Sequence, residues 1–439
     1  MADDIVKSWV VTADMGLGHQ RAVWPFLKNA EGGIITLETD EATSESEKLL
    51  WKRVRSSYEL LSRLKNVPLA GKKAFGILDY LLNIPPLYPI RNRSHSSFQV
   101  KFLKRLINKG LCEGVLKKAS KKPLPFMTSF YAPAIAAENA DFLKIYCIIC
   151  DSDLNRVWVA GDPYSSRIEY FVPCTRAAKR LNTYGVPDSR IYITGFPLPV
   201  ELLGGPDLGV LKKDLGKRLC RLDPEGRFRP LHERNVEHFL GKENYIPSCP
   251  EQITIMFSVG GAGAQKEIGS EIAQSFRDKI RNGKIRLLLS AGTKREVYDY
   301  FLTVKKDIDP GGKGVSLIFS DNREEYFRMF NERLHETDIL WTKPSELSFY
   351  SALGLPVIIS PDIGPQERYN KKWLLETQAG LLQEDPKYAD QWLTDLVRMG
   401  RLAECAWSGF LKGRKYGTYR ILEVLSTGAM KEADSPLRR

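Results

Sequence analysis

The sequence predicts an α/β protein that is built from two doubly wound parallel sheets. Short apolar runs, typical of buried strands, alternate with helical segments, and this alternation occurs in two successive blocks. The first strand of each block is followed by a glycine-containing turn, in residues 12–21 and 258–264. Ligands of doubly wound sheets bind at the carboxyl ends of the strands, so the two turns predict one ligand site in each half.

The first block predicts an N-terminal Rossmann-like domain over residues 1–203. Its expected strands are short and apolar, and they cover 9–11, 33–37, 125–129, 143–149, 169–172 and 191–194. Residues 131–139 and 175–184 are expected to form helices between these strands. Such alternation favours parallel pairing with helices on both faces of the sheet.

The second block predicts a C-terminal domain over residues 251–400, after a stretch at 204–250 that is rich in glycine, proline and charge. We interpret that stretch as a linker followed by an elaboration whose role the sequence leaves open. The expected strands are 252–258, 285–290, 315–319, 339–341 and 356–360, with a helix from about 265 to 281. Residues 401–425 predict a terminal amphipathic helix, and the polar tail 426–439 is expected to be disordered.

Composition indicates a soluble globular protein with a cytoplasmic location. Of the 439 residues, 43% are hydrophobic and 27% are charged. The N-terminus lacks the apolar region of a signal peptide, and no run approaches the ~20 apolar residues of a membrane span. The seven cysteines are expected to be reduced thiols. Cys147 and Cys150 have the spacing of half a zinc site, but the isoleucines between them favour buried strand thiols.

A basic insertion occupies residues 44–122 and contains 18 Lys and Arg against 5 Asp and Glu. This surplus accounts for the net charge of +12 of the whole chain. Three interpretations are open: packed helices with a solvated face, docking onto an anionic membrane surface, or nucleic-acid binding. No nucleic-acid-binding motif accompanies the charge, so we favour peripheral docking on the inner face of the membrane. Arg91 and Arg93 have two possible roles. They are expected either to contact a phosphate of the acceptor substrate or a lipid headgroup, or to lie in a solvated loop.

The turn after the first strand contains Gly16, Gly18 and His19. A strand that leads through a glycine turn into a helix leaves backbone N–H groups that suit an anion. His19 is able to accept a proton from a substrate hydroxyl near neutral pH. The turn lacks the third glycine of a dinucleotide fingerprint and the Gly-Lys-Ser/Thr of a P-loop.

A series of short motifs follows the strands of both halves. In the first half these are Asp14–His19, Cys150–Asp153 with Trp158, Tyr184–Pro187 and Ile193–Pro197. In the second half they are Ser258–Ala264, Thr342–Pro344, Gly354–Pro356 and Gln366-Glu367 with Asn370. Together these segments resemble the GT-B glycosyltransferases of the monogalactosyldiacylglycerol synthase branch, which are related to the N-acetylglucosaminyltransferase of the lipid-linked peptidoglycan precursor. The resemblance covers residues 6–200 and 251–425, and the second-half series is its most specific part.

The resemblance implies two facing Rossmann-like domains with a last helix that crosses back to the first. It also implies an inverting, metal-independent transfer of a hexose or N-acetylhexosamine from a UDP-sugar to a lipid-linked or membrane-proximal acceptor. His19 would act as the base, with Asp151 or Asp153 assisting, and Gly16 and Gly18 would lie on the acceptor side. The donor-binding residues would be Gly260, Gly261, Gly263, Thr342, Lys343, Glu346, Gln366, Glu367 and Asn370.

Departures from the family pattern keep two other functions open. The family continues Thr-Lys-Pro with two glycines and later places a ribose-binding glutamate, where this chain has Ser345-Glu346 and Ser351-Ala352. Glu346 is a candidate replacement for the missing carboxylate. The altered ribose site favours, as an alternative, a catalytically silent sugar-nucleotide- or glycan-binding protein on the same scaffold. A sugar-nucleotide epimerase is the third possibility.

Overall fold

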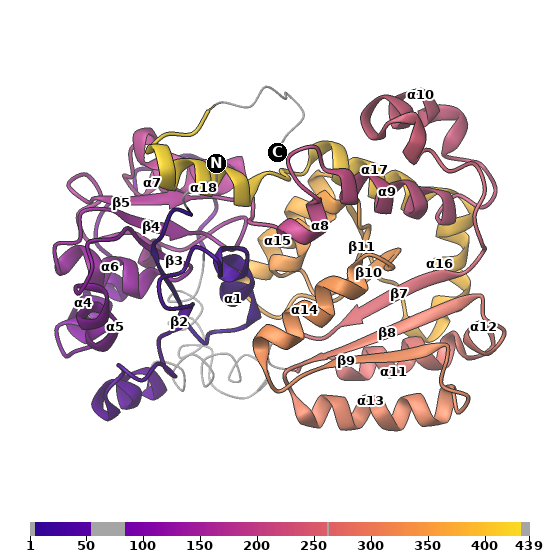
Figure 1. Ribbon diagram of the computed structural model, residues 1–439, viewed down its shortest axis with the longest axis horizontal. Helices are drawn as coiled ribbons and strands as arrows, with labels where there is room; N and C mark the ends of the chain where they lie inside the picture. The colour runs from indigo at the N-terminus through magenta and orange to yellow at the C-terminus, as the bar shows by residue number, and fades with distance from the viewer. Residues whose placement is uncertain (1–4, 54–83, 261–262, 432–439) are drawn as a thin grey trace. The chain divides into compact units, whose positions relative to one another are not determined.

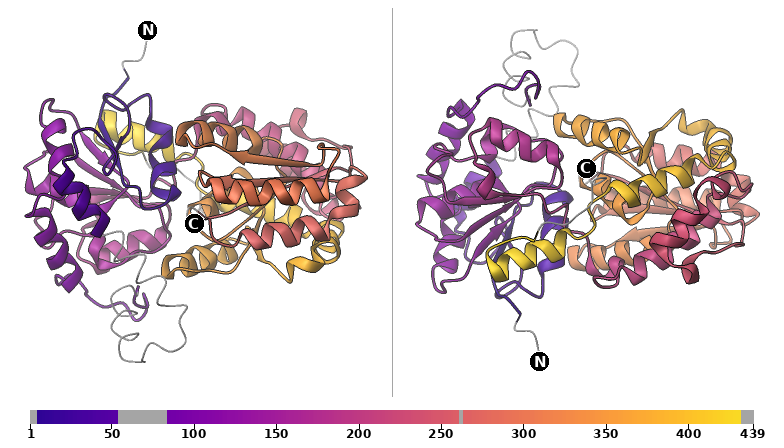
Figure 2. Two further views of the ribbon diagram at one scale, coloured as in Figure 1. Left: turned by 90° about the horizontal axis from the view of Figure 1, so that it is seen from below. Right: turned by 90° about the horizontal axis from the view of Figure 1, so that it is seen from above.

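The computed structural model describes residues 5–53, 84–260 and 263–431 of the chain. Backbone contacts divide these residues into two units. The first unit comprises residues 5–53, 84–197, 363–369 and 416–431, and the second comprises 198–260, 263–362 and 370–415. Figure 1 shows both units as sheets that are covered by helices, and Figure 2 shows the same layers from two further directions.

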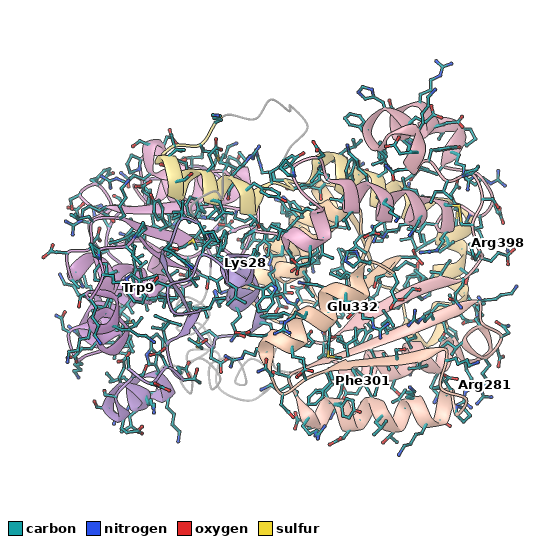
Figure 3. The ribbon with its side chains drawn as sticks, viewed as in Figure 1. Trp9, Lys28, Arg281, Phe301, Glu332 and Arg398 are labelled. Atoms are coloured by element: carbon teal, nitrogen blue, oxygen red, sulfur yellow. A yellow bond between two sulfur atoms is a disulfide. The ribbon has the colours of Figure 1, made fainter. Side chains whose placement is uncertain are left out.

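The first unit contains a six-stranded parallel sheet in the order β2-β1-β3-β4-β5-β6. Its strands are β1 (Trp9–Thr12), β2 (Ile35–Thr36), β3 (Phe126–Thr128), β4 (Ile145–Ile148), β5 (Ile168–Phe171) and β6 (Ile191–Tyr192). After β2 the chain returns to the other side of β1, so the strand order reverses between β1 and β3. This reversal is the topological switch point of the sheet. All four residues of β1 are buried because helices cover both faces, and Trp9 at its start is labelled in Figure 3.

Most helices of the first unit lie in the connections between its strands, and α18 comes from the C-terminal end of the chain. They are α1 (Leu17–Val23), η1 (Trp24–Phe26), α4 (Phe98–Ile107), α5 (Glu113–Ala119), α6 (Tyr131–Asn139), η2 (Arg156–Trp158), α7 (Thr175–Thr183), η3 (Asp188–Arg190) and α18 (Gly417–Thr427). The short side chains of Ala132, Ala134 and Ala136 in α6 are all buried. Small residues at these positions let α6 pack closely on β3 and β4.

The second unit contains another six-stranded parallel sheet, in the order β12-β11-β10-β7-β8-β9. Its strands are β7 (Ile253–Ser258), β8 (Ile285–Gly292), β9 (Val315–Phe319), β10 (Ile339–Thr342), β11 (Val357–Ile359) and β12 (Gly380–Leu382). The first three strands run to one side and the last three to the other, so the switch point lies between β7 and β10. Two parallel, doubly wound sheets confirm the predicted α/β fold class.

Helices of the second unit follow the same alternation. They are α8 (Val200–Leu203), α9 (Gly209–Arg221), α10 (Arg229–Leu240), η4 (Lys242–Asn244), α11 (Lys266–Ser275), α12 (Arg277–Arg281), α13 (Arg295–Ile308), α14 (Arg323–Leu334), η5 (Glu346–Leu353), α15 (Pro365–Glu376), η6 (Pro386–Tyr388), α16 (Ala389–Arg398) and α17 (Arg401–Lys412). The first turn of α15 is grouped with the first unit. Phe301 of α13, labelled in Figure 3, packs edge-to-face on Phe257 of β7 at 6.4 Å between ring centroids.

Residues 204–250, interpreted from the sequence as a linker and an elaboration, form α9, α10 and η4 within the second unit. The buried Arg218 of α9 donates hydrogen bonds to four backbone carbonyls, those of Leu334 (3.4 Å), Thr337 (2.9 Å), Leu353 (3.0 Å) and Gly354 (3.2 Å). A guanidinium with several donors suits such a cluster of carbonyl oxygens. These hydrogen bonds attach α9 to the segment before β10 and to the end of η5.

The C-terminal part consists of two helices, α17 and α18, and only α18 belongs to the first unit. Its residue Arg420 donates to the carbonyls of Ile193 and Thr194, which follow β6. Figure 1 shows α18, in yellow, beside the first sheet. The predicted return of the last helix to the first domain is therefore confirmed. The facing of the two domains stays a prediction.

One expectation about the cysteines is wrong. Cys220 of α9 and Cys249 are joined by a disulfide across a Cα–Cα distance of 6.2 Å, whereas the sequence predicted seven reduced thiols. The odd number of cysteines gave no indication of this pair, and a sequence separation of 29 matches no metal or disulfide motif. Cys147 in β4 and Cys150 shortly after it are buried and take no part in this disulfide.

Part of the basic insertion lies outside the described residues, namely 54–83. In its described part, the buried carboxylate of Glu47 accepts hydrogen bonds from the N–H groups of Cys112 (2.9 Å) and Gly114 (3.0 Å) at the start of α5. Burial raises the pKa of Glu47, and these hydrogen bonds oppose that rise. None of the helices in the described ranges is long and apolar enough to cross a bilayer.

Candidate functional site

The glycine turn after β1 places His19 in the first turn of α1. Gly16 is the residue before the helix and has a φ of 110°, which side-chain-bearing residues rarely adopt. Gly18 lies inside the helix, next to His19. The side chain of Gln20 donates a hydrogen bond of 3.0 Å to Asp14, which connects the start of the helix to the turn. The turn is therefore fixed by a hydrogen bond, and its backbone conformation requires a glycine at position 16.

His19 lies at the switch point of the first sheet, where it connects α1 to the segment after β3. Its Nδ1 lies 2.7 Å from the carbonyl oxygen of Ser129, which follows β3. Because a carbonyl only accepts, Nδ1 carries the proton and Nε2 is left as the acceptor nitrogen. The hydroxyls of Ser129 and Thr12 are 2.9 Å apart and buried, and they hold the ends of the two strands together. The fold thus fixes the tautomer in which His19 is able to take a proton through Nε2.

Apolar surroundings keep the imidazole of His19 neutral. The ring packs against Phe130 at 5.1 Å and Trp158 at 5.9 Å between centroids, and the thiol of Cys150 lies 3.6 Å from Nδ1. Burial disfavours the charged ring and lowers the pKa of His19 to about 4, and the hydrogen bond to Ser129 only partly opposes this effect. Part of the side chain is nevertheless exposed. At neutral pH, His19 is therefore an uncharged base.

The two aspartates after β4 lie in different environments. Asp153 is fully buried and accepts hydrogen bonds from Arg176 (2.8 Å) and Arg180 (2.6 Å), as well as from the backbone N–H of Leu154 (2.9 Å). These contacts favour a structural role for Asp153 over the catalytic role that the sequence suggested. Asp151, two residues earlier, is partly exposed.

The arginines that were predicted to meet an acceptor lie on the segment before α4. Arg91 is exposed and Arg93 is half-buried, and the backbone N–H of Arg93 donates to the carbonyl of Thr183 at 2.7 Å. Among the residues that the structure describes, no hydrogen bond or ion pair joins either guanidinium to the residues around His19. Their acceptor-binding role stays a prediction.

In the second unit, Lys343 lies against the glycine loop that follows β7. A Cβ added to Gly260 would collide with the Cε of Lys343 and would lie 3.1 Å from its Nζ. Lys343 directly follows β10, the neighbour of β7, and the hydroxyl of Thr342 donates to the carbonyl of Ser258 at 3.1 Å. The ammonium group is thus held beside bare loop backbone at the switch point of the sheet. Positive charge next to open backbone in this position suits a phosphate group.

The end of the glycine loop is also connected to the segment after β11. Gln265 precedes α11 and donates a hydrogen bond of 2.9 Å to the carbonyl of Pro361. Gly263 has a φ of 73°, which explains a glycine at that position, and Gly261 lies outside the described residues. Three segments, after β7, β10 and β11, therefore meet at one edge of the second sheet. We call this edge the second-sheet site; it contains residues 258–260, 263–265, 342–346 and 360–362.

The remaining predicted donor residues lie on η5 and α15. Glu346 is buried at the start of η5. The carboxylate of Glu367 accepts a hydrogen bond of 2.7 Å from the backbone N–H of Ile363, which connects α15 to the segment before it. Gln366 is half-buried beside it, and Asn370 is fully buried in the same helix. Gln366 and Glu367 belong to the first unit, whereas Asn370 belongs to the second.

Sequence reasoning missed several groups at these two edges. Ser129 and Phe130 follow β3, and Gln265 and Ser360 lie near the ends of the glycine loop and β11. Position alone indicates them, since each immediately follows a strand or precedes a helix at the carboxyl edge of a parallel sheet. Ser129 acts through its carbonyl, which leaves no side-chain pattern to recognise. Across the described ranges, no group of three or more His, Cys, Asp or Glu is arranged to hold a metal ion.

Comparisons with known proteins give a short sequence match and several structural similarities. Residues 248–310 match the family described as a domain of unknown function, DUF6938. No protein with a curated description matches the chain in sequence.

Among solved structures, a putative UDP-N-acetylglucosamine 2-epimerase from Listeria monocytogenes is similar at a TM-score of 0.47 and 13% identity, over 96% of this chain and 97% of that chain. The UDP-GlcNAc 2-epimerase from Neisseria meningitidis, bound to UDP-GlcNAc, has a TM-score of 0.47 and 12% identity, over 96% and 100%. The calicheamicin glycosyltransferase CalG4 has a TM-score of 0.44 and 10% identity, over 97% and 100%. None of these similarities assigns a substrate to this chain.

Proposed function

We propose that this protein is an inverting glycosyltransferase that transfers a hexose or N-acetylhexosamine from a UDP-sugar to a lipid-linked or membrane-proximal acceptor. The observation that supports it most directly is the state of His19: a neutral imidazole whose tautomer is fixed by the Ser129 carbonyl, 2.7 Å away. The second-sheet site supplies Lys343 beside the open backbone of Gly260 for a diphosphate. The proposal requires both sites to act on the same sugar.

The chemistry of an inverting transfer fits these groups. The acceptor hydroxyl gives its proton to Nε2 of His19, and its oxygen attacks the anomeric carbon of the donor sugar. The bond from that carbon to the diphosphate oxygen breaks, and the electron pair leaves with the UDP. Lys343 and the N–H groups of the loop would stabilise the developing charge, in place of a metal ion. The proton and the leaving group are thereby both accounted for by residues of this chain.

UDP binding tests the second-sheet site. Replacing Lys343 with alanine removes a cation from the diphosphate, and we expect the Kd for UDP in calorimetric titration to rise by about 10- to 100-fold. Gly260→Ala should have a similar effect, because its Cβ displaces the flexible end of Lys343. That displacement involves a mobile side chain and not backbone, so the melting temperature should change little.

Matched controls for this titration are Lys313→Ala and Gly311→Ala. Lys313 is exposed, and a Cβ at Gly311 would meet nothing closer than an Asp309 oxygen at 4.0 Å. Both controls should bind UDP like the wild-type protein. If Lys343→Ala and the wild-type protein bind UDP with equal affinity, the diphosphate does not bind at this edge of the sheet.

A catalytically silent nucleotide-binding protein is the second candidate, and Ser351 favours it. The family pattern places a ribose-binding carboxylate there, whereas the buried hydroxyl of Ser351 donates to the carbonyl of Ser348 at 2.7 Å. An internal hydrogen bond of this kind does not replace a carboxylate. Incubation of the protein with labelled UDP-sugars and mixed-lipid liposomes separates the two functions, since only the transferase forms a labelled glycolipid.

We also propose that the protein docks peripherally on an anionic membrane surface through α4. Phe98 and Phe102 stack at 6.4 Å between centroids on its outer face, and they are 64% and 49% exposed. Lys101, Lys104 and Arg105 lie on the same helix. Exposed aromatic rings surrounded by basic side chains suit the boundary between lipid headgroups and acyl chains.

Liposome sedimentation tests this docking. The bound fraction should rise with the content of anionic lipid and fall as salt is added, because the attraction is largely electrostatic. Replacing Phe98 and Phe102 with serine should reduce binding severalfold, whereas Phe239→Ser, an exposed phenylalanine of α10, should not. Binding that ignores both lipid charge and salt would contradict the docking proposal.

A further inference from the structure

Four buried hydroxyl residues lie at the carboxyl edge of the second sheet. Ser290, Ser258 and Thr342 are in register across β8, β7 and β10, and Ser360 directly follows β11. None of the four side chains is more than 2% exposed. Ser258, Thr342 and Ser360 belong to the second-sheet site, whereas Ser290 lies one strand further away, on β8.

Three of these hydroxyls have partners within the protein. Ser290 lies 3.0 Å from the hydroxyl of Tyr326, Thr342 donates to the carbonyl of Ser258 at 3.1 Å, and Ser258 donates to the carbonyl of Val259 at 3.4 Å. The Oγ of Ser360 has no hydrogen-bond partner in the part of the chain that the structure describes. A buried hydroxyl without a partner costs free energy, because it has lost its hydrogen bonds to water and gained none in return.

The backbone around Ser360 is tightly held. Its N–H donates to the carbonyl of Thr342 at 3.0 Å, and the carbonyl of the next residue, Pro361, accepts from Gln265 at 2.9 Å. These two bonds connect Ser360 to the segment of Lys343 on one side and to the glycine loop on the other. An unsatisfied hydroxyl therefore lies where the three loops of the site meet.

We propose that Ser360 is a binding residue for the nucleoside diphosphate, with its hydroxyl donating to an oxygen of the bound ligand. The inference rests on the nucleotide site of the proposed function and adds a residue to it. The hydroxyl is covered in the ligand-free protein, and a change of its χ1 rotamer is the small movement that would turn it towards the ligand. The ligand then supplies the partner that the protein lacks.

A ligand-binding hydroxyl and a structural hydroxyl respond differently to replacement by alanine. Ser360→Ala should leave the melting temperature of the unliganded protein unchanged or higher, because it removes an unsatisfied group. The same variant should raise the Kd for UDP by about 10-fold. Ser290→Ala is the matched control: it breaks the contact with Tyr326, so it should lower the melting temperature and leave the Kd for UDP unchanged.

The experiment is a calorimetric titration of the full chain with UDP, together with thermal melts without ligand, for wild type and both variants. Loss of UDP affinity in Ser360→Ala at unchanged melting temperature supports the inference. Wild-type affinity in Ser360→Ala, or a melting temperature lowered as much as in Ser290→Ala, overturns it and leaves the nucleotide site standing. A wild-type protein that does not bind UDP overturns both the site and the inference.

Discussion

Replacing His19 with alanine should lower kcat by about 10²- to 10⁴-fold, the contribution typical of a positioned general base. The Kd for UDP should stay within a few-fold of wild type, since no donor contact is assigned to the imidazole. The physical reason is the fixed tautomer: Nδ1 is engaged by Ser129, so proton transfer depends on Nε2 alone. Rates of labelled glycolipid formation and UDP titrations measure the two quantities separately.

The pH dependence expected for the proposed transfer follows from the same environment. Because burial lowers the pKa of His19 to about 4, the base is already unprotonated at pH 7. Activity limited by this group should therefore be constant from about pH 8 down to pH 5 and should fall only as the pH approaches 4. His95→Ala, at an exposed histidine, is the control and should retain wild-type rates. Wild-type turnover in His19→Ala would show that the base is another group.

Replacing Asp153 with alanine should destabilise the protein by about 3–5 kcal/mol, the cost of removing one partner from a buried ion pair. The carboxylate is fully buried, and its loss would leave Arg180, which is also fully buried, without its charged partner. Arg176, which pairs with the same carboxylate at 2.8 Å, would lose its contact as well. Denaturant unfolding followed by circular dichroism should show the change as a lower midpoint.

Asp207→Ala is the control for this measurement, because Asp207 is exposed and its loss should leave the midpoint unchanged. The outcome also separates a structural from a catalytic aspartate. An Asp153→Ala protein with wild-type stability and no turnover would return Asp153 to the catalytic role that its position after β4 first suggested. A destabilised protein would confirm the ion pair as the reason for an aspartate at this position.

Most strands were predictable because they are largely apolar and buried. The mostly apolar run Val315–Phe319 produced the bounds of β9, and Tyr131–Asn139 was predicted as the helix that the structure shows. The short β12 was missed, since Gly380–Leu382 offers too few apolar residues to indicate a strand. The helix α9 was not predicted, because charged residues and glycines surround its apolar residues in the sequence. Leu211, Leu215 and Leu219 nevertheless have the four-residue spacing of a buried helical face.

In the candidate site, the residues predicted from the sequence are ones whose side chains carry the proposed chemistry. His19 and Lys343 were identified from motifs, and the structure places each of them at a switch point. The carbonyl of Ser129 determines the tautomer of His19, yet a backbone oxygen leaves no trace in a sequence. For Asp153 the sequence suggested a catalytic role that its contacts do not favour. Its position after a strand resembled that of a catalytic residue, but its carboxylate pairs with arginines more than twenty positions away in the sequence.

A crystal structure of the protein with bound UDP tests the central claim most directly. We predict that the diphosphate lies over Gly260 in contact with the ammonium group of Lys343, at the switch point between β7 and β10. A diphosphate bound away from the glycine loop, with Lys343 still packed against Gly260, would contradict the assignment of this edge as the nucleotide site.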